Sequence, residues 1–332
     1  MRLAINGYGR VGRCILRAIF DMGLEKEFQV VAINDLADPE LMSHLTQYDS
    51  TFGKFACNVS YKKGEMQIKG HTIALLSYEK ATELPWKDLN IDLCLECSGR
   101  YATHELASQH LTAGAKKVLV SQPCKGADKT IVYGVNHQQL TAEDSIVSNA
   151  SCTTNCLAPL LTVLQQTIGV RSGIMTTIHA YTNNQNLIDK ATGGFYRSRS
   201  ATQSMIPTRT GAAKAIALVI PELAGKLHGM AIRIPTINVS LIDLTIVPER
   251  KTSIEGLHQH IKNASENELQ GVLAYNDRPL VSIDLTAHPA SCVFDANHTA
   301  IVGDQIKLMS WYDNEWAFSL RMLDVARVMF SL

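Results

Sequence analysis

The spacing Gly7-x-Gly9-x-x-Gly12, set between an apolar strand pattern at residues 2–6 and a helical pattern, constrains the fold of this chain most. Glycines at these positions allow a tight turn and let the backbone approach a pyrophosphate at the amino terminus of the helix. The next strand pattern ends at Asp35, whose carboxylate would bind ribose hydroxyls and repel a 2′-phosphate. The glycines alone also fit an ordinary turn, but this context predicts a dinucleotide site that prefers NAD to NADP.

The order of the patterns predicts two domains of different architecture in these 332 residues. Strand and helix patterns alternate up to about residue 150, which indicates a parallel, doubly wound sheet. Later, the β-branched stretch 232–247 alternates like one long antiparallel strand with a covered face, and residues 252–255 resemble a capping box. The polar segment 181–210 is too long for a simple connection, which indicates a functional loop.

The composition limits the classes of function. The 31 Lys and Arg residues balance 31 Asp and Glu residues, so no overall charge favours nucleic acid or an anionic membrane as a partner. No apolar run is long enough to span a membrane, and the strand pattern beginning at Arg2 leaves no room for a signal peptide. Eight cysteines in this setting indicate reduced thiols, so we expect a cytoplasmic protein.

The stretch 148–156 carries the clearest sign of catalysis. Cys152 follows an apolar strand pattern and begins an apolar helical pattern. A thiol at the amino terminus of a helix faces free backbone N–H groups and the positive end of the helix dipole, which stabilise the nucleophilic thiolate. We expect Cys152 to attack a carbonyl carbon, with its pKa lowered by the helix and by a protonated histidine.

Among the eleven histidines, His179 is the candidate base, because it ends a strand pattern directly before the long polar loop. Its position alone slightly favours an ordinary hydrogen-bonded histidine, so its pairing with the nucleophile is a hypothesis. Cys156 is better explained as a small buried residue than as a resolving thiol. Cys94 and Cys97 form no metal site, because residues three apart on a strand point to opposite faces, and we expect no metal.

Polar side chains in the second half could bind phosphate. Arginines do so through paired hydrogen bonds, and hydroxyls can assist them. The candidates are Arg197, Arg199, Arg233, Ser151, Thr153, Thr182 and Thr210. For any single one of them, solvated loop polarity is the simpler explanation.

Five segments, in order and spread over the whole chain, resemble those of glyceraldehyde-3-phosphate dehydrogenases. They are Ala4-Ile-Asn-Gly-Tyr-Gly-Arg-Val-Gly12, Ser148-Asn-Ala-Ser-Cys-Thr-Thr-Asn-Cys156, Ile178-His-Ala-Tyr-Thr182, Thr210-Gly-Ala-Ala-Lys214 and Trp311-Tyr-Asp-Asn-Glu-Trp316. The nine-residue cysteine motif is highly specific, and by this resemblance the chain is identified as a member of that family. The resemblance implies a Rossmann-type NAD-binding domain over residues 1–150, with a C-terminal helix at 315–332 packing back on it. It also implies an α+β catalytic domain with a mainly antiparallel sheet over residues 151–314, and a homotetramer.

The resemblance further implies roles for individual residues. Cys152 would form a thiohemiacetal with a phosphorylated aldehyde, and His179 would act as base and assist hydride transfer to NAD. Inorganic phosphate would then cleave the thioester, and its pocket would be formed by Ser151, Thr153, Thr210, Gly211 and Arg233. The phosphate of the substrate would contact Thr182 and Arg197, with Arg233 nearby. Contacts with NAD would come from the glycine loop (Gly7, Gly9 and Gly12) and from Arg10, Val11, Asp35, Ser121 and Asn314.

The chain also departs from the family pattern. Lys190 and Ala191 stand where the family has a Leu-Pro pair near the adenosine, which leaves the strictness of the NAD preference open. A common Glu-Arg pair reads Glu79-Lys80, and a usual tyrosine is Phe318.

Two readings of the substrate follow. Phe318 and the segments 34–37 and 235–238 resemble erythrose-4-phosphate dehydrogenases, which hydrolyse the thioester with water, whereas 180–182 and 210–213 resemble the phosphorylating enzymes. We expect oxidative phosphorylation of glyceraldehyde 3-phosphate to 1,3-bisphosphoglycerate, with erythrose-4-phosphate oxidation as the alternative. A Cys–His hydrolase or acyltransferase without a redox cofactor, and a non-catalytic NAD-binding protein, are the rivals from other classes.

Overall fold

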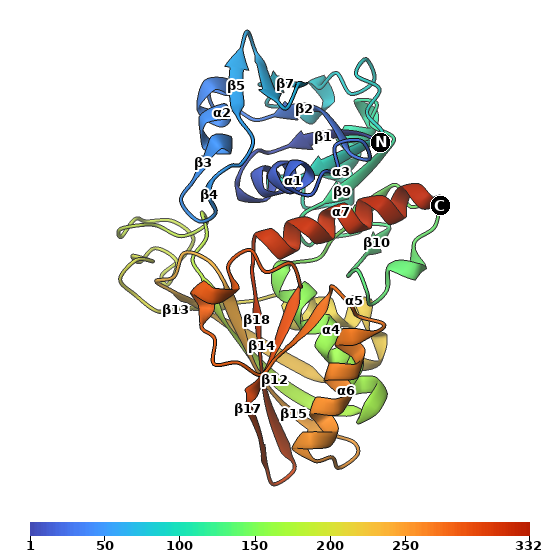
Figure 1. Ribbon diagram of the computed structural model, residues 1–332, viewed down its shortest axis with the longest axis vertical. Coiled ribbons are helices and arrows are strands. Elements are labelled where there is room, and N and C mark those ends of the chain that lie inside the picture. Colours follow the sequence, from blue (N-terminus) through green and yellow to red (C-terminus); the bar gives the residue numbers. More distant parts are fainter. The chain divides into compact units, whose positions relative to one another are not determined.

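The computed structural model describes residues 1–332, which divide into two units (Figure 1). Unit 1 comprises Met1–Ile131, His137–Ala150 and Ser319–Leu332, and unit 2 comprises Val132–Asn136 and Ser151–Phe318. A mostly parallel sheet forms unit 1 and a mainly antiparallel sheet forms unit 2, so the predicted fold class is confirmed.

Unit 1 is built on a nine-stranded sheet of order β10-β11-β9-β8-β1-β2-β7-β6-β5. The parallel strands are β1 (Arg2–Asn6), β2 (Gln29–Asn34), β7 (His71–Leu76), β8 (Leu93–Glu96), β9 (Lys117–Val120), β10 (Lys129–Thr130) and β11 (Ile146–Ser148). The antiparallel strands β5 (Val59–Lys62) and β6 (Glu65–Ile68) extend one edge, and β3 (Tyr48–Asp49) pairs with β4 (Gly53–Lys54) separately. The helices are α1 (Arg10–Asp21), α2 (Pro39–Gln47) and α3 (His104–Thr112). The alternation of strand and helix patterns in residues 1–150 does not predict this antiparallel edge.

Local chemistry explains where the helices of unit 1 begin. The Asp38 side chain accepts a hydrogen bond from the backbone of Leu41 at the start of α2, and Thr103 accepts one from Leu106 at the start of α3. The turn between β1 and α1 requires glycine, because Gly7 has a φ of 89° and a Cβ there would lie 2.3 Å from the Cα of Ser98. The predicted glycine turn is therefore present between β1 and α1.

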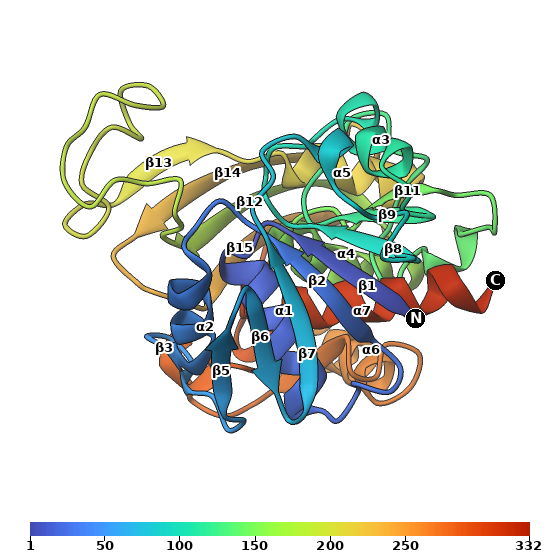
Figure 2. The ribbon, with the colours of Figure 1, turned by 90° about the horizontal axis from the view of Figure 1, so that it is seen from above.

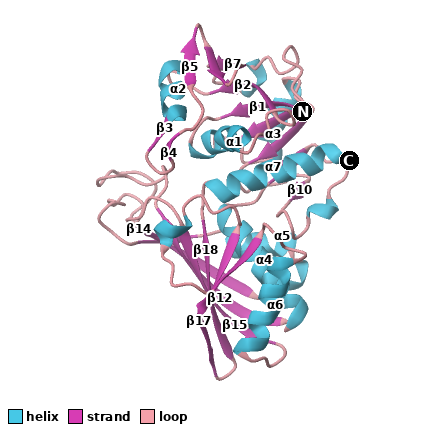
Figure 3. Ribbon diagram, in the orientation of Figure 1, coloured by secondary structure: helices cyan, strands magenta, loops and turns pink.

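Unit 2 is built on a seven-stranded sheet of order β13-β14-β12-β15-β18-β17-β16. Its strands are β12 (Val170–Ala180), β13 (Ile206–Arg209), β14 (Leu227–Ile234), β15 (Ser240–Pro248), β16 (Leu273–Asn276), β17 (Cys292–Val302) and β18 (Gln305–Tyr312). The helices α4 (Cys152–Thr167), α5 (Ala212–Val219) and α6 (Ile254–Glu266) gather on one side of this sheet (Figure 3). Along β15, buried residues alternate with half-buried ones, as expected for a sheet with one covered face.

Two sequence predictions for unit 2 were wrong. The stretch 232–247 is not one strand, because β14 and β15 pair with opposite edges of β12, in parallel and antiparallel directions. The chain must leave the sheet between them, where Pro235 lacks an N–H group and Val239 adopts a φ of 64°. The cap of α6 is Ser253, which accepts a hydrogen bond from Gly256, one residue after the expected start of the capping box.

The segment 181–210 ends in the strand β13 and otherwise forms a loop that projects beyond this strand (Figure 2). The last helix, α7 (Trp316–Ser331), belongs to unit 1 from Ser319 onward. There Arg327 forms hydrogen bonds of 2.6 and 2.9 Å to Glu27, and Lys117 donates to the carbonyl of Met329. None of the helices has both the length and the apolar character needed to cross a membrane.

Candidate active site

Cys152 is the first residue of α4, at the junction of strand and helix that the sequence predicted. Ala150, just before it, turns the chain with a φ of 57°, an uncommon conformation for a residue with a Cβ. Ser151 caps the helix, because its hydroxyl accepts a hydrogen bond of 3.1 Å from the backbone of Thr154. The thiol therefore lies in the first turn, next to the backbone N–H groups of the helix terminus.

His179 faces this thiol from the neighbouring sheet. Its Nε2 lies 3.6 Å from the Sγ of Cys152, and its Nδ1 lies 2.6 Å from the carbonyl oxygen of Ala180. Arg233 stands opposite His179 in the register of β12 and β14, with Nη1 2.5 Å from Nδ1 and 2.9 Å from the same carbonyl. The hypothesis that His179 pairs with the thiol therefore has a direct geometric basis.

The charges of this pair differ from the sequence expectation. Burial raises the pKa of the Cys152 thiol, and the Arg233 guanidinium is the largest opposing influence. Burial and then the charge of Arg233 lower the pKa of His179 to about 3. The expected imidazolium is thus wrong for the resting protein: His179 is neutral, and Arg233 is the cation that favours the thiolate.

Tyr312 connects the elements that carry Cys152 and His179, and it is not among the residues predicted from the sequence. Its buried hydroxyl lies 2.9 Å from the hydroxyl of Thr153 on α4 and 2.8 Å from that of Thr177 on β12. Its ring also meets the His179 ring edge to face. Buried and half-buried residues alternate along β18, and Tyr312 lies on the buried face. This alternation is the sequence pattern that could have indicated a buried role for Tyr312.

The candidate phosphate ligands are distributed over several elements. Arg197 and Arg233 are near enough for the charge of Arg197 to lower the pKa of Arg233, which burial already lowers most. Arg197 also donates to Thr208 at 3.0 Å, in the loop segment. The remaining hydroxyl and backbone candidates lie at helix starts or in turns: Ser151 and Thr153 at α4, Thr210 and Gly211 before α5, and Thr182 bonded to Gln185. Arg199 instead forms an exposed ion pair with Asp189. Neither Thr182 nor Thr210 bonds to Cys152 or His179.

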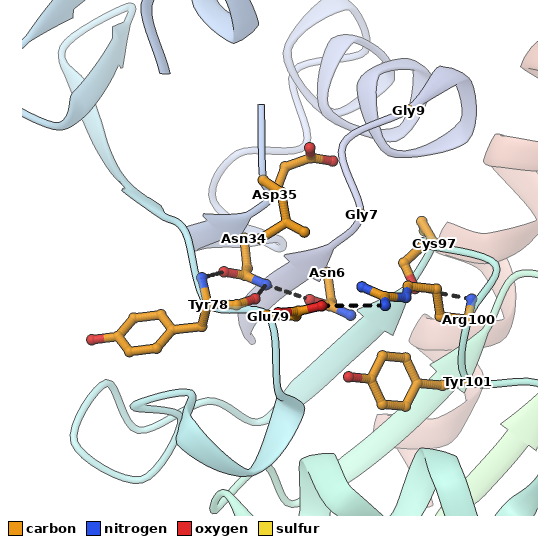
Figure 4. Close-up of a pocket in the computed structure, with 12 residues that line it drawn as sticks. Asn6, Gly7, Gly9, Asn34, Asp35, Tyr78, Glu79, Cys97, Arg100 and Tyr101 are labelled. Atoms are coloured by element: carbon orange, nitrogen blue, oxygen red, sulfur yellow. Dashed lines mark hydrogen bonds and ion pairs between the residues drawn. The ribbon is translucent and has the colours of Figure 1, made fainter. Parts of the chain in front are cut away.

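A separate cavity of about 250 Å³ lies in unit 1 at the glycine loop, and we call it the glycine-loop pocket (Figure 4). Its lining comprises Asn6, Gly7, Gly9, Asn34, Asp35, Leu36, Tyr78, Glu79, Cys97, Ser98, Arg100 and Tyr101. Asp35 is held there by hydrogen bonds from the backbones of Tyr8 (2.7 Å) and Ala37 (3.0 Å). Its carboxylate still has lone pairs for further donors.

The glycine-loop pocket fits a dinucleotide. A Cβ on Gly9 would meet no protein atom within 4 Å, so the space beside the loop is open to a ligand. The first turn of α1 has no side-chain cap, which leaves its backbone N–H groups for an anion such as a pyrophosphate.

The other residues expected to bind the cofactor lie in both units and contact different neighbours. Arg10 forms an ion pair with Asp49, and Val11 lies in the first turn of α1. Ser121 hydrogen-bonds the thiol of Cys97, which lines the glycine-loop pocket. Asn314 belongs to unit 2, where its Oδ1 accepts a hydrogen bond of 2.9 Å from Ser240. No group of three or more acidic, histidine or cysteine side chains is arranged to hold a metal ion.

Comparison with known proteins accounts for nearly the whole chain. Residues 1–104 match the NAD binding domain of glyceraldehyde 3-phosphate dehydrogenase, and residues 151–314 match its C-terminal domain. The glyceraldehyde-3-phosphate dehydrogenase of Pseudomonas aeruginosa is 53% identical over 326 residues, covering 98% of this chain and 97% of that protein. A plasmid-encoded glyceraldehyde-3-phosphate dehydrogenase of Cupriavidus necator is 51% identical over 327 residues, with 98% and 97% covered, and that of Zymomonas mobilis is 50% identical over 335 residues, with 99% and 98% covered. The chain therefore belongs to the glyceraldehyde-3-phosphate dehydrogenase family, as an enzyme that uses NAD.

Proposed function

We propose that this enzyme oxidises glyceraldehyde 3-phosphate to 1,3-bisphosphoglycerate with NAD and inorganic phosphate, through covalent intermediates on Cys152. The observation that carries the proposal is the pair Cys152–His179, with 3.6 Å between Sγ and Nε2 and with Arg233 beside it. In this proposal residues 151–314 perform the covalent chemistry, and residues 1–150 with the helix 315–332 bind the dinucleotide.

Cys152 and His179 form a nucleophile–base pair in this scheme. In the tautomer whose Nδ1–H donates to the carbonyl of Ala180, the Nε2 of the neutral imidazole carries a lone pair toward the thiol, and Arg233 donates to the same carbonyl rather than to Nδ1. His179 takes the thiol proton as Sγ attacks the aldehyde carbon and returns this proton to the oxyanion, which gives a thiohemiacetal and leaves the imidazole neutral. A low pKa suits His179 for this role, because it keeps the imidazole unprotonated at neutral pH.

NAD, when bound, would supply the hydride acceptor for oxidation of the thiohemiacetal carbon. His179 removes the hydroxyl proton in the same step, which leaves a thioester on Cys152. Asn314 would orient the carboxamide of the cofactor, because Ser240 occupies its Oδ1 and its amide nitrogen donates to no protein atom. Asp35 would bind the adenosine ribose, and the N–H groups of the first turn of α1, with Arg10 and Val11, would bind the diphosphate. Ser121 would contribute a further cofactor contact.

Phosphate cleaves the thioester in the last step and expels the Cys152 thiolate. Ser151, Thr153, Thr210, Gly211 and Arg233 would hold the attacking phosphate, and Thr182 and Arg197 would hold the phosphate of the substrate. Two helix amino termini and two neighbouring guanidiniums support this assignment, because each favours an anion.

We further propose that the enzyme forms a homotetramer in the cytoplasm. The loop after β12 exposes large apolar side chains, with exposed fractions of 68% for Leu187, 77% for Ile188 and 98% for Phe195. A surface of this kind is typical of an interface, and sedimentation of the purified protein would give its mass. All eight cysteines are free, as is usual for thiols in a reducing compartment.

Production of NADH from glyceraldehyde 3-phosphate and from erythrose 4-phosphate, each with and without inorganic phosphate, tests the reaction. We expect phosphate-dependent turnover with a preference for glyceraldehyde 3-phosphate. Phosphate-independent turnover that prefers erythrose 4-phosphate would assign the chain to the alternative activity, which Phe318 favours. Substitution of NADP for NAD in the same assay measures the effect of Lys190 and Ala191, and we expect Asp35 to maintain the preference for NAD.

A further inference from the structure

A fully buried carboxylate lies beneath the glycine-loop pocket. Glu96 ends β8, is 0% exposed and accepts four hydrogen bonds. Asn6 Nδ2 (2.5 Å) and His110 Nε2 (3.0 Å) donate to one oxygen, while the backbone N–H (2.8 Å) and the hydroxyl (2.5 Å) of Ser98 donate to the other. A carboxylate is costly to bury unless several donors compensate it, so this arrangement requires an explanation.

The histidine of this cluster is fixed in one neutral form. Trp86, which is fully buried, donates its indole N–H to the Nδ1 of His110 at 3.1 Å. Nδ1 is therefore an acceptor, and the single ring proton is on Nε2, which faces Glu96. No cation compensates Glu96, so its charge is stabilised by hydrogen-bond donors alone.

The same hydrogen bonds extend into the wall of the pocket. Asn34 donates to the Oδ1 of Asn6 at 2.8 Å, and it exchanges hydrogen bonds with the backbone of Tyr78 at 2.8 and 3.0 Å. The backbone of Arg100 donates to the hydroxyl of Ser98 at 3.1 Å. Figure 4 shows Asn6 and Asn34 together on the wall of the pocket, with Tyr78 beside them. Along these side-chain bonds each donor points toward the carboxylate. Glu96 therefore fixes which way the Asn6 amide faces, together with Asn34, whose own amide is held by both backbone groups of Tyr78.

We propose that Glu96, supported by His110 and Trp86, is a positioning residue for NAD: it sets the orientation of the polar groups that line the glycine-loop pocket before the cofactor binds. It touches no ligand itself, since Asn6, Asn34 and Ser98 lie between it and the cavity. This inference rests on the use of NAD, and it does not depend on which aldehyde is oxidised.

A glutamine at position 96 would break the arrangement while keeping nearly the same shape. All four partners are donors, and the glutamine amide nitrogen is also a donor, so it would face either Asn6 and His110 or both groups of Ser98. The Asn6 amide would then turn over or lose its partner, and the wall of the pocket would change with it.

Calorimetry with Glu96→Gln tests the proposal, with NAD and ADP-ribose as separate ligands. We expect both dissociation constants to rise by about tenfold, the consequence of one misplaced hydrogen-bonding group. At saturating NAD, kcat should stay near that of the wild type, and the rate of Cys152 labelling by iodoacetamide should not change. Asp92→Asn is the matched control, because Asp92 precedes β8 and its carboxylate binds Arg2 and Lys116 at the other end of this strand.

The affinities of Glu96→Gln for NAD and ADP-ribose either support or refute the positioning role of Glu96. If Glu96→Gln binds both ligands as tightly as Asp92→Asn does, or loses kcat without losing affinity, the positioning role is refuted. Should Glu96→Gln fail to fold, Ser98→Ala removes one side-chain donor from the carboxylate and should weaken ADP-ribose binding by a smaller factor. Unchanged affinity in that variant would also refute the proposal. Weaker ADP-ribose binding in a protein that oxidises neither aldehyde would support this inference and contradict the proposed function.

Discussion

The buried, neutral state of His179 makes a measurable prediction about stability. Burial and the charge of Arg233 lower its pKa from 6.5 to about 3, so the folded protein does not protonate it in mildly acidic solution. In the unfolded chain the same imidazole takes up a proton near its ordinary pKa of about 6.5. A proton that only the unfolded chain binds favours unfolding, so the stabilising contribution of His179 is complete above pH 6.5 and declines as the pH falls toward 3.

The magnitude follows from the shift. One proton gives a slope of about 1.4 kcal/mol per pH unit, and the interval from 6.5 to about 3 gives a total loss of roughly 5 kcal/mol. At pH 5 the loss is about 2 kcal/mol. His179→Gln cannot titrate, so its free energy of unfolding should fall less with acidity than that of the wild type. The difference between the two proteins should therefore change by about 1.4 kcal/mol per pH unit below pH 6.5.

Urea unfolding followed by circular dichroism between pH 5 and 7 measures this difference, because the other titrating groups are common to both proteins. Tyr312→Phe is the neighbouring control. It removes hydrogen bonds to Thr153 and Thr177 and should lower the free energy of unfolding by about 1–2 kcal/mol. That loss should be equal at every pH, because burial raises the pKa of Tyr312 far above this range. Parallel curves for wild type and His179→Gln would refute the neutral, buried histidine.

Three further outcomes test the site residue by residue. Cys152→Ser should abolish NADH production and leave the affinity for NAD measured by calorimetry unchanged; residual turnover at the wild-type rate would exclude covalent catalysis. Iodoacetamide should label Cys152 at least about tenfold faster than Cys156 at pH 7, as read by peptide mass mapping, because Cys156 is fully buried and its pKa is raised further. Ser240→Ala should raise the dissociation constant for NAD by about tenfold by releasing the amide of Asn314, whereas Ser310→Ala, which removes a buried hydroxyl without a hydrogen-bond partner, should not.

Features set by neighbours in the sequence were predictable. The glycine turn depends on steric room next to β1, and the caps at Asp38 and Thr103 depend on a side chain and an N–H group three residues later. The start of α4 at Cys152 likewise depends on a nearby cap, because the Ser151 hydroxyl accepts from the backbone of Thr154. The caps and the start of α4 are decided within one turn of chain, so the residue types alone determine them, whereas the glycine turn also depends on the distant backbone of Ser98.

Features set by the pairing of distant strands were not predictable. The stretch 232–247 has an uninterrupted β-branched pattern, yet its halves pair with opposite edges of β12, and only the sheet order reveals the break. Glu96 lies between Cys94 and Cys97 in the sequence, and its hydrogen-bond partners come from β1, α3 and a loop. Long-range hydrogen bonds of this kind leave no periodic signal in the sequence.

The charge state of the catalytic pair shows why position alone was insufficient. A helix terminus favours a thiolate by a modest amount, whereas removal of the thiol from water opposes it, and burial is the larger effect on Cys152. The cation that offsets this burial is Arg233, which also lowers the pKa of His179. An anion paired with Arg233 would cancel part of that charge, so a phosphate bound there, as we propose, would raise the basicity of His179 and weaken the support for the thiolate. In the proposed scheme, binding of phosphate and the basicity of His179 would therefore be coupled through one guanidinium.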